Sequence, residues 1–269
     1  MKRIFSLILF ASIFIACSKN AVTGKSQFTL FSESDLQSMS TQQYQQFLSS
    51  NKVVPVSSGN RDVDMVKRVG QRITQAAEAL LAERGKSDFV KGYKWEYNLV
   101  ESKEVNAWCM PGGKIVVYTG LLPITQNEAA LAVVMGHEVC HALLQHGNQR
   151  MSQQMGAEVA AAGLAAALSS KPVETQNAFM SAFGLGAQVG VLLPFSRKQE
   201  SEADEYGLYL AAMAGYNPEE AIPLWERMEK AGNGQKPPEF LSTHPSEGKR
   251  IDQLKKIMPE ALKRYRPMK

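Results

Sequence analysis

The sequence carries little excess charge of either sign. It has 30 lysines and arginines against 26 aspartates and glutamates, and two of the basic residues, Lys2 and Arg3, lie at the extreme N-terminus. Without these two, the net charge is about +2. Nucleic-acid-binding domains carry clustered basic charge, so this balance gives no reason to expect a nucleic-acid partner. Hydrophobic residues make up 44% of the 269 residues, which is enough for the core of one medium-sized domain.

Cysteine and histidine are also scarce. The chain has three cysteines, and nothing in the sequence places Cys109 near Cys140, so a disulfide bond between them is not predicted, although an exported protein could have one. Cys140 is expected to be a small buried apolar residue. Only four histidines are present, which leaves few candidates for imidazole ligands of a metal ion.

The N-terminus lacks an apolar run long enough to cross a membrane. The run from Ile4 to Ala16 follows two basic residues and is shorter than the ~20 residues that a membrane-spanning helix needs. It fits the charged and apolar regions of a secretory signal. Residues 14–17 resemble a bacterial lipobox, with Phe14 in the place of the usual leucine. We therefore expect residues 1–16 to be a lipoprotein-type signal peptide and Cys17 to be lipidated. The simpler alternative is an ordinary signal peptide with an incidental cysteine.

The rest of the chain divides into an N-terminal tether and helix, residues 17–60, and one folded domain, residues 61–269. Apolar residues recur at helical spacing from Arg61 up to a stop at Gly85. Residues 154–193 are rich in small residues, and we expect closely packed buried helices there rather than a membrane span. Further helices are expected over residues 34–48, 197–214, 224–230 and 250–264, and strands over residues 94–100 and 114–118.

A long helix is expected to begin at Thr125. Thr125 and Glu128 fit a capping box, in which the two side chains satisfy free backbone N–H groups at the start of a helix. The helix should run to about His146, with Gly147 as its C-cap. Its second half carries the sequence His137-Glu138-Val139-Cys140-His141.

This sequence has the spacing of a metal site. His137 and His141 lie four residues apart, so a helix places both imidazoles on one face, where they can reach one metal ion. Zinc accepts two imidazoles and a carboxylate and keeps a fourth position for water, whose proton Glu138 can take. The pattern predicts a metallopeptidase with one zinc ion per chain. Matches of five residues also arise by chance, and the alternative is two solvated histidines beside a glutamate.

A third protein ligand is needed. His146 lies nine residues after His137, about half a turn away around the same helix, so it cannot share the ion unless the helix breaks. A polar contact near the helix end is its expected role. His244 is conceivable as a ligand, but Glu200 fits better, because Asp204 lies four residues later and can accept the N–H of a ligand histidine. The alternative is a solvated acidic start of a helix.

Several segments resemble peptidase family M48, the family of the CAAX prenyl proteases. Within it they are most similar to an exported bacterial branch related to a mitochondrial inner-membrane stress protease. The likeness covers nearly all of the chain after the signal region and keeps the order of the family's motifs, although Cys140 stands where the family more often has alanine. The matching segments are residues 20–24 (with Ala21 in place of proline), 106–113, 120–122, 137–147, 196–204 and 242–245.

The resemblance implies a mostly helical, zincin-like α+β domain with a small β-sheet beside the active-site helix. It implies Glu200 as the third zinc ligand and Asp204 as the partner of a ligand histidine. It places Asn106 and Ala107 beside the cleft, where an extended polypeptide substrate can add as a strand. For His244 it implies a position near the zinc, either as an oxyanion stabiliser or as a cap on the resting metal.

The sequence therefore predicts a zinc-dependent endopeptidase on the periplasmic side of a bacterial envelope. We expect acyl chains on Cys17 to anchor it in a membrane, and we expect that membrane to be the outer one. Misfolded or misassembled envelope proteins are the expected substrates, and the outer-membrane protein assembly machinery is an expected partner. Two other classes stay open. One is an envelope chaperone or assembly factor that binds chains in the cleft with little proteolysis. The other is a structural lipoprotein with a fortuitous motif.

Overall fold

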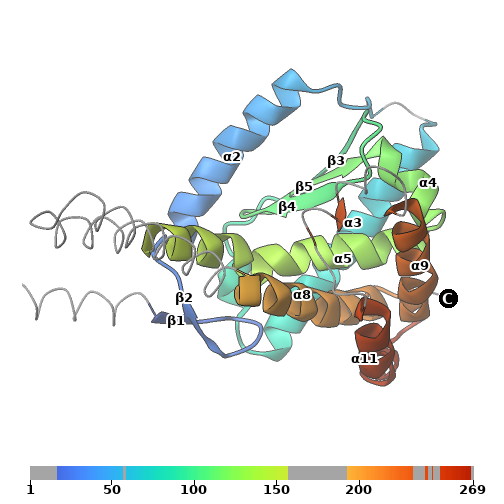
Figure 1. Ribbon diagram of the computed structural model, residues 1–269. Helices are drawn as coiled ribbons and strands as arrows, with labels where there is room; N and C mark the ends of the chain where they lie inside the picture. Colours follow the sequence, from blue (N-terminus) through green and yellow to red (C-terminus); the bar gives the residue numbers. More distant parts are fainter. Residues whose placement is uncertain are drawn as a thin grey trace, which may run out of the picture.

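The computed structural model describes residues 17–56, 59–156, 193–232, 240–241, 244 and 249–267 (Figure 1). A three-stranded sheet lies in the middle of this part of the chain, with its strands in the order β3-β5-β4. β3 runs parallel to β5 and β4 runs antiparallel to it, so β4 forms one edge. The strands are β3 (Glu96–Val100), β4 (Ala107–Met110) and β5 (Lys114–Tyr118).

Helices cover both faces of this sheet. They are α2 (Glu33–Ser50), α3 (Arg61–Glu83) and α5 (Glu128–Leu143). The central strand β5 is buried along its length because its side chains alternate between two hydrophobic clusters. Ile115 and Val117 pack on the side of α3 and α5, whereas Val116 and Tyr118 pack on the side of α2.

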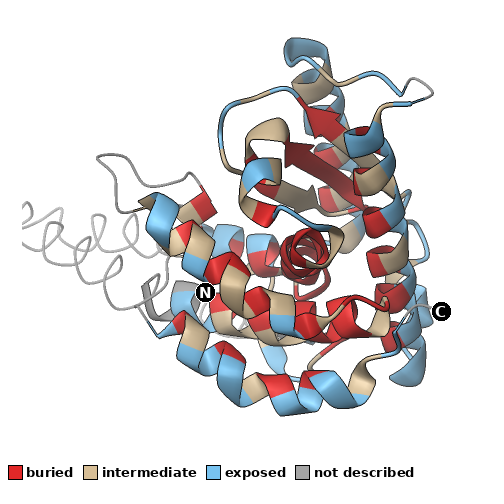
Figure 2. Ribbon diagram, turned by 90° about the vertical axis from the view of Figure 1, so that its right-hand side faces the viewer, coloured by how far each residue is buried: buried red, intermediate tan, exposed pale blue. Residues whose placement is uncertain are grey.

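The helix α5 is the centre of the molecule. Figure 2 looks down its axis and shows it buried on all sides. The sheet lies on one side of α5, and α8 (Leu193–Met213) lies along the other (Figure 1). Helices α9 (Ala221–Gly232) and α11 (Arg250–Arg264) complete the domain at one end. The observed fold confirms the expected α+β domain, mostly helical, with a small sheet beside the helix that carries the two histidines.

A pair of glycines sets the distance between α5 and α8. A Cβ atom built on Gly207 would lie 2.7 Å from the backbone nitrogen of His137, and one built on Gly136 would lie 2.6 Å from the carbonyl oxygen of Gly207. No side chain fits between the two backbones at this point. The contact therefore places the face of α8 directly beside the first histidine of α5.

The N-terminal segment is packed against the end of α5. β1 (Cys17–Lys19) and β2 (Ser26–Phe28) form an antiparallel hairpin. The side-chain amide of Asn20 donates to the carbonyl oxygen of Leu143, the last residue of α5. The structure thus shows an ordered hairpin where a loose tether was expected, and the division of the chain at residues 60 and 61 stays a prediction.

The expected ends of α5 were wrong. The N-cap is Asn127, whose side chain accepts from the backbone N–H of Ala130, and Thr125 instead ends the short helix α4 (Leu122–Thr125). Asparagine is a better N-cap than threonine, and the left-handed backbone at Gln126 separates the two helices. α5 stops at Leu143, Gln145 has a φ of 56°, and residues 146–156 are helical again, so Gly147 is not a C-cap.

The expected helix over residues 250–264 and the expected strand over residues 114–118 have the predicted bounds, whereas several other elements differ in length. The helices expected over residues 34–48, 197–214 and 224–230 are each longer, and the strand expected over 94–100 is shorter. β4 and the N-terminal hairpin were not predicted. The short elements are η1 (Ser87–Val90), η2 (Thr119–Leu121) and η4 (Pro218–Glu220). Within the described ranges, no helix combines the length and the apolar character that a membrane span requires. Most of the expected helices over residues 154–193 lie outside the described residues.

The close approach of α5 and α8 predicts that adding one methyl group at Gly207 lowers the stability of the fold. Gly207→Ala should destabilise the fold by about 1–3 kcal/mol or more, because the methyl group meets backbone rather than a movable side chain. Urea unfolding measures this change. Gly156→Ala is the control, since among the described residues a Cβ there meets Phe28 alone, at 3.9 Å. Equal stability of Gly207→Ala and the parent chain would refute the packing argument.

Candidate metal centre

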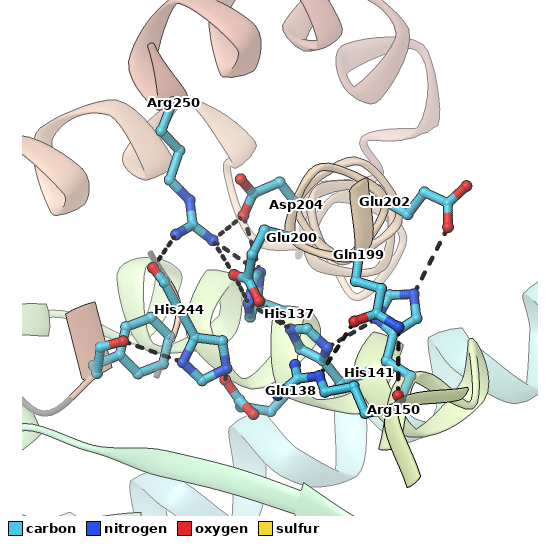
Figure 3. Close-up of polar contacts among 12 residues, drawn as sticks. His137, Glu138, His141, Arg150, Gln199, Glu200, Glu202, Asp204, His244 and Arg250 are labelled. Atoms are coloured by element: carbon cyan, nitrogen blue, oxygen red, sulfur yellow. Dashed lines mark hydrogen bonds and ion pairs between the residues drawn. The ribbon is translucent and has the colours of Figure 1, made fainter. Parts of the chain in front are cut away.

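The two histidines of α5 meet at their ring nitrogens. Nε2 of His137 lies 2.9 Å from Nε2 of His141 (Figure 3). Both side chains are buried, as is Glu138 between them in the sequence. The spacing of four residues on one helix therefore produces the convergence that the sequence predicted.

A carboxylate of α8 completes a three-residue cluster. Oε2 of Glu200 lies 3.4 Å from Nε2 of His137, and Oε1 lies 3.4 Å from Nε2 of His141. Figure 3 shows Glu200 entering from α8 above the two imidazoles. Glu200 reaches them because the glycine contact brings α8 against α5 at this level.

His244 adds a fourth group from another part of the chain. Its Nε2 lies 3.4 Å from Oε1 of Glu138, and its ring stacks on Phe240 with centroids 4.4 Å apart. One ligand atom from each of His137, His141, Glu200 and His244 lies within 4.8 Å of the others. Among the described residues, these four make up the group that could hold a metal ion.

The donor set fits zinc. Zinc–ligand bonds of ~2.0–2.1 Å in a tetrahedron put neighbouring ligand atoms roughly 3.3 Å apart, close to the 2.9 and 3.4 Å found here. Oε1 of Glu138 and Oε1 of Glu200 are buried and make no hydrogen bond within the described residues. Buried acceptors without donors are costly, and a cation held by His137, His141 and Glu200 would satisfy the oxygen of Glu200.

The two carboxylates beside His137 favour a positive charge on that ring. Burial lowers the pKa of His137, but hydrogen bonds to Asp204 and Glu200 outweigh it and raise that pKa to about 9. Burial raises the pKa of Glu138 to about 8. Burial also lowers the pKa of His244 to about 3, so its ring is neutral at physiological pH.

Asp204 holds His137 from behind. Its Oδ1 lies 2.9 Å from Nδ1 of His137, so the ring donates there and turns Nε2 toward the centre. Burial raises the pKa of Asp204, but the Arg250 guanidinium and His137 outweigh it and keep that pKa low. The resemblance to family M48 implied this partner for a ligand histidine, whereas the spacing to Glu200 alone left a solvated acidic face equally open.

Arg250 is a site residue that sequence reasoning missed. Its buried guanidinium donates to Asp204 at 2.6 Å, to Glu200 at 3.3 Å and to the carbonyl oxygen of His244 at 3.2 Å. It also lies over the ring of Trp225, 3.6 Å from the centroid. The signal was an arginine at the first position of a helix, where the helix dipole disfavours a basic residue.

His146 is not part of the metal cluster. The break at Gln145 turns the chain so that Nδ1 of His146 lies 2.9 Å from Nδ1 of His141, on the side of that ring away from the centre. The predicted polar contact near the helix end is therefore present, but it lies in a new helical segment rather than in α5.

A cavity of about 200 Å³ opens beside Glu138 and His141. Its lining includes Trp108 and Cys109 of β4, whereas Asn106 and Ala107 are not part of it. Ala107 is buried and pairs with Val117. The edge strand β4 thus lines the cavity, but the lining residues lie two positions later in the sequence than the predicted Asn106 and Ala107.

The remaining predictions concern the cysteines. Cys109 and Cys140 are both free thiols, as expected. The side chain of Cys17 lies outside the described part of the structure, so lipidation stays a prediction.

Known proteins with similar sequences include metallopeptidases. Residues 67–258 match the sequence model of a family described as Peptidase family M48. The chain is 37% identical over 190 residues to the mitochondrial metalloendopeptidase OMA1 of Schizosaccharomyces pombe, covering 70% of this chain and 53% of that protein. It is 30% identical over 156 residues to the beta-barrel assembly-enhancing protease of Escherichia coli, covering 56% and 32%. The chain thus spans about half or less of the length of these relatives.

Because Asp204 contacts His137, we predict that replacing Asp204 weakens metal binding. Asp204→Asn removes the charged acceptor that fixes the ring, and zinc should bind roughly 10–100-fold more weakly. Competition with a chromophoric chelator measures the affinity. Glu205→Gln, one residue further along α8, is the control and should bind zinc as the parent does. Unchanged affinity in Asp204→Asn would remove Asp204 from the site.

Proposed function

The chain belongs to peptidase family M48, and we propose that it is a zinc-dependent endopeptidase whose metal is held by His137, His141 and Glu200. The observation that carries this proposal is the convergence of two imidazoles and a carboxylate from α5 and α8, with the carboxylate of Glu138 beside them. Family membership supports the same chemistry. The activity, substrates and partners of the whole protein are part of the proposal.

Glu138 is the proposed general base. A zinc ion bound here would lower the pKa of water and polarise a peptide carbonyl. Glu138 then takes a proton from the attacking water and delivers it to the leaving amide nitrogen. Burial holds the pKa of Glu138 near neutrality, where a group can both accept and return a proton.

An extended polypeptide is the proposed substrate. β4 lies at the edge of the sheet, and Trp108 and Cys109 of this strand line the cavity beside Glu138. Among the described residues, the outer edge of β4 pairs with no strand, and a substrate strand that pairs with it would pass its scissile bond in front of His137 and His141.

His244 is proposed to cap the metal in the resting enzyme. Its Nδ1 lies 3.2 Å from the carbonyl oxygen of Phe240, so the proton is on Nδ1 and Nε2 faces the cluster as an acceptor. Such a ring can bind a cation, whereas an oxyanion stabiliser must donate from Nε2. The geometry therefore supports the cap over the alternative role.

The proposed setting is the periplasmic side of a bacterial envelope. The apolar run before Cys17 supports export and lipidation, and one relative is the bacterial beta-barrel assembly-enhancing protease. Misfolded or misassembled envelope proteins are the proposed substrates, and the assembly machinery of outer-membrane proteins is the proposed partner. Labelling with a radioactive fatty acid tests the anchor, because no label on the full chain, or equal label on Cys17→Ser, would refute it.

Replacing Glu138 separates an enzyme from a chaperone. Glu138→Gln should keep one zinc per chain and lose casein cleavage by roughly 10²–10⁴-fold, the usual contribution of a general base. Zinc analysis and casein digestion measure the two properties. Glu226→Gln, an exposed carboxylate of α9, is the control. Zinc binding without cleavage in the parent chain would favour an assembly factor that binds unfolded chains.

Removing the proposed cap should release activity. His244→Ala is expected to raise the rate of cleavage of a short fluorogenic peptide at pH 7.5 severalfold, because water could then occupy the coordination position that His244 is proposed to cap. A fall in kcat of roughly 10²–10³-fold would instead identify His244 as an oxyanion stabiliser.

A further inference from the structure

The two ligand histidines are held from behind in different ways. Nδ1 of His137 meets the carboxylate of Asp204, which is the common arrangement for a metal-binding histidine. Nδ1 of His141 meets no carboxylate and instead lies 2.9 Å from Nδ1 of His146. The function of this second contact is not explained by the mechanism above.

The direction of the second hydrogen bond follows from the metal site. Nε2 of His141 faces the cluster and must carry a lone pair there, so the proton of this ring is on Nδ1. Nδ1 of His146 then accepts that proton, which leaves the N–H of His146 on Nε2.

Nε2 of His146 points to a carboxylate of α8. Oε2 of Glu202 lies 3.7 Å from it, and the backbone carbonyl of His146 accepts from Gln199 at 3.4 Å. Nε2 of His146 is buried and makes no hydrogen bond within the described residues, so this contact is an approach and not a hydrogen bond. The nearby His146 ring and the hydrogen bond from Lys25 lower the pKa of Glu202 to about 2, so Glu202 is ionised. Figure 3 shows Glu202 and Gln199 on α8, on the side of His141 opposite to Arg250.

The chain of contacts ends in the N-terminal hairpin. Nζ of Lys25, in the turn between β1 and β2, lies 2.9 Å from Oε1 of Glu202. The hairpin also holds the break after α5, because Asn20 donates to the carbonyl oxygen of Leu143 and Gln149 donates to Gln27 at 3.0 Å. The hairpin thus fixes the backbone at the point where His146 turns toward His141.

We infer that His146 is a positioning residue for the metal ligand His141, and that Glu202 and Lys25 extend this support to the N-terminal hairpin. His146 is not one of the four cluster residues and does not line the cavity, and it acts by fixing the tautomer and the orientation of His141. The inference rests on the proposed metal site.

Two substitutions of His146 test the inference on the full chain. His146→Leu fills the same space without an acceptor and should weaken zinc binding roughly 10–100-fold in a chelator competition. His146→Gln offers a carbonyl to His141 and an amide to Glu202, and it should restore affinity to within a few-fold of the parent. A thermal melt of each apo protein measures stability separately.

The outer end of the support is tested with two exposed lysines of the hairpin. Lys25→Ala should weaken zinc binding by at most a few-fold, because exposed ion pairs contribute little, and this loss should vanish in the His146→Leu background. Lys19→Ala, which changes the charge of the same hairpin equally, should bind zinc as the parent does.

The outcomes separate this inference from the proposed function. Unchanged zinc affinity in a folded His146→Leu variant would overturn the inference. Equal losses of zinc affinity in His146→Leu and His146→Gln, together with lower stability of both apo proteins, would also overturn it. Absence of zinc from the parent chain would instead overturn the metal site itself.

Discussion

The contact between the backbones of α5 and α8 at Gly136 and Gly207 is the constraint on which the rest of the site depends. A side chain at either glycine would separate the helices, and Glu200 would then no longer lie 3.4 Å from the ring nitrogens of His137 and His141. The sheet on one side of α5 and α8 on the other bury this helix from Ala130 to Leu143. Burial removes water from the imidazoles and from Glu138, which strengthens every electrostatic interaction between them.

Burial of so many polar groups is tolerated because most of them are paired. Arg250 bridges Asp204, Glu200 and the backbone of His244, so one guanidinium connects three parts of the chain. An incompletely paired buried network is destabilising, and two carboxylate oxygens of this site, on Glu138 and Glu200, make no hydrogen bond within the described residues. The protein therefore keeps free acceptors where a cation would bind. A metal ion bound as proposed would satisfy the oxygen of Glu200 and stabilise the fold.

Local periodicity predicted the parts of this site that lie on one helix. His137 and His141 share a face because they are four residues apart, and the same rule relates Glu200 to Asp204. The resemblance to family M48 joined these two pairs into one site, and it also gave the fold class. The motif thus predicted which side chains meet, but not how the backbone brings them together.

Features that depend on tertiary contacts were not predictable. Gln145 has no sequence signal for its left-handed backbone, so the break that brings His146 to His141 was missed. Arg250 lies far from the motif in sequence and reaches it only through the packing of α11 against α8. β4 was missed because its four residues, Ala107 to Met110, are too few to show an alternation.

The most direct test of the account is to locate the metal in crystals of the parent chain by anomalous scattering at the zinc edge. The account predicts one peak per chain, within bonding distance of Nε2 of His137, Nε2 of His141 and a carboxylate oxygen of Glu200. A zinc-loaded crystal with no peak there, or with its peak elsewhere, would contradict it.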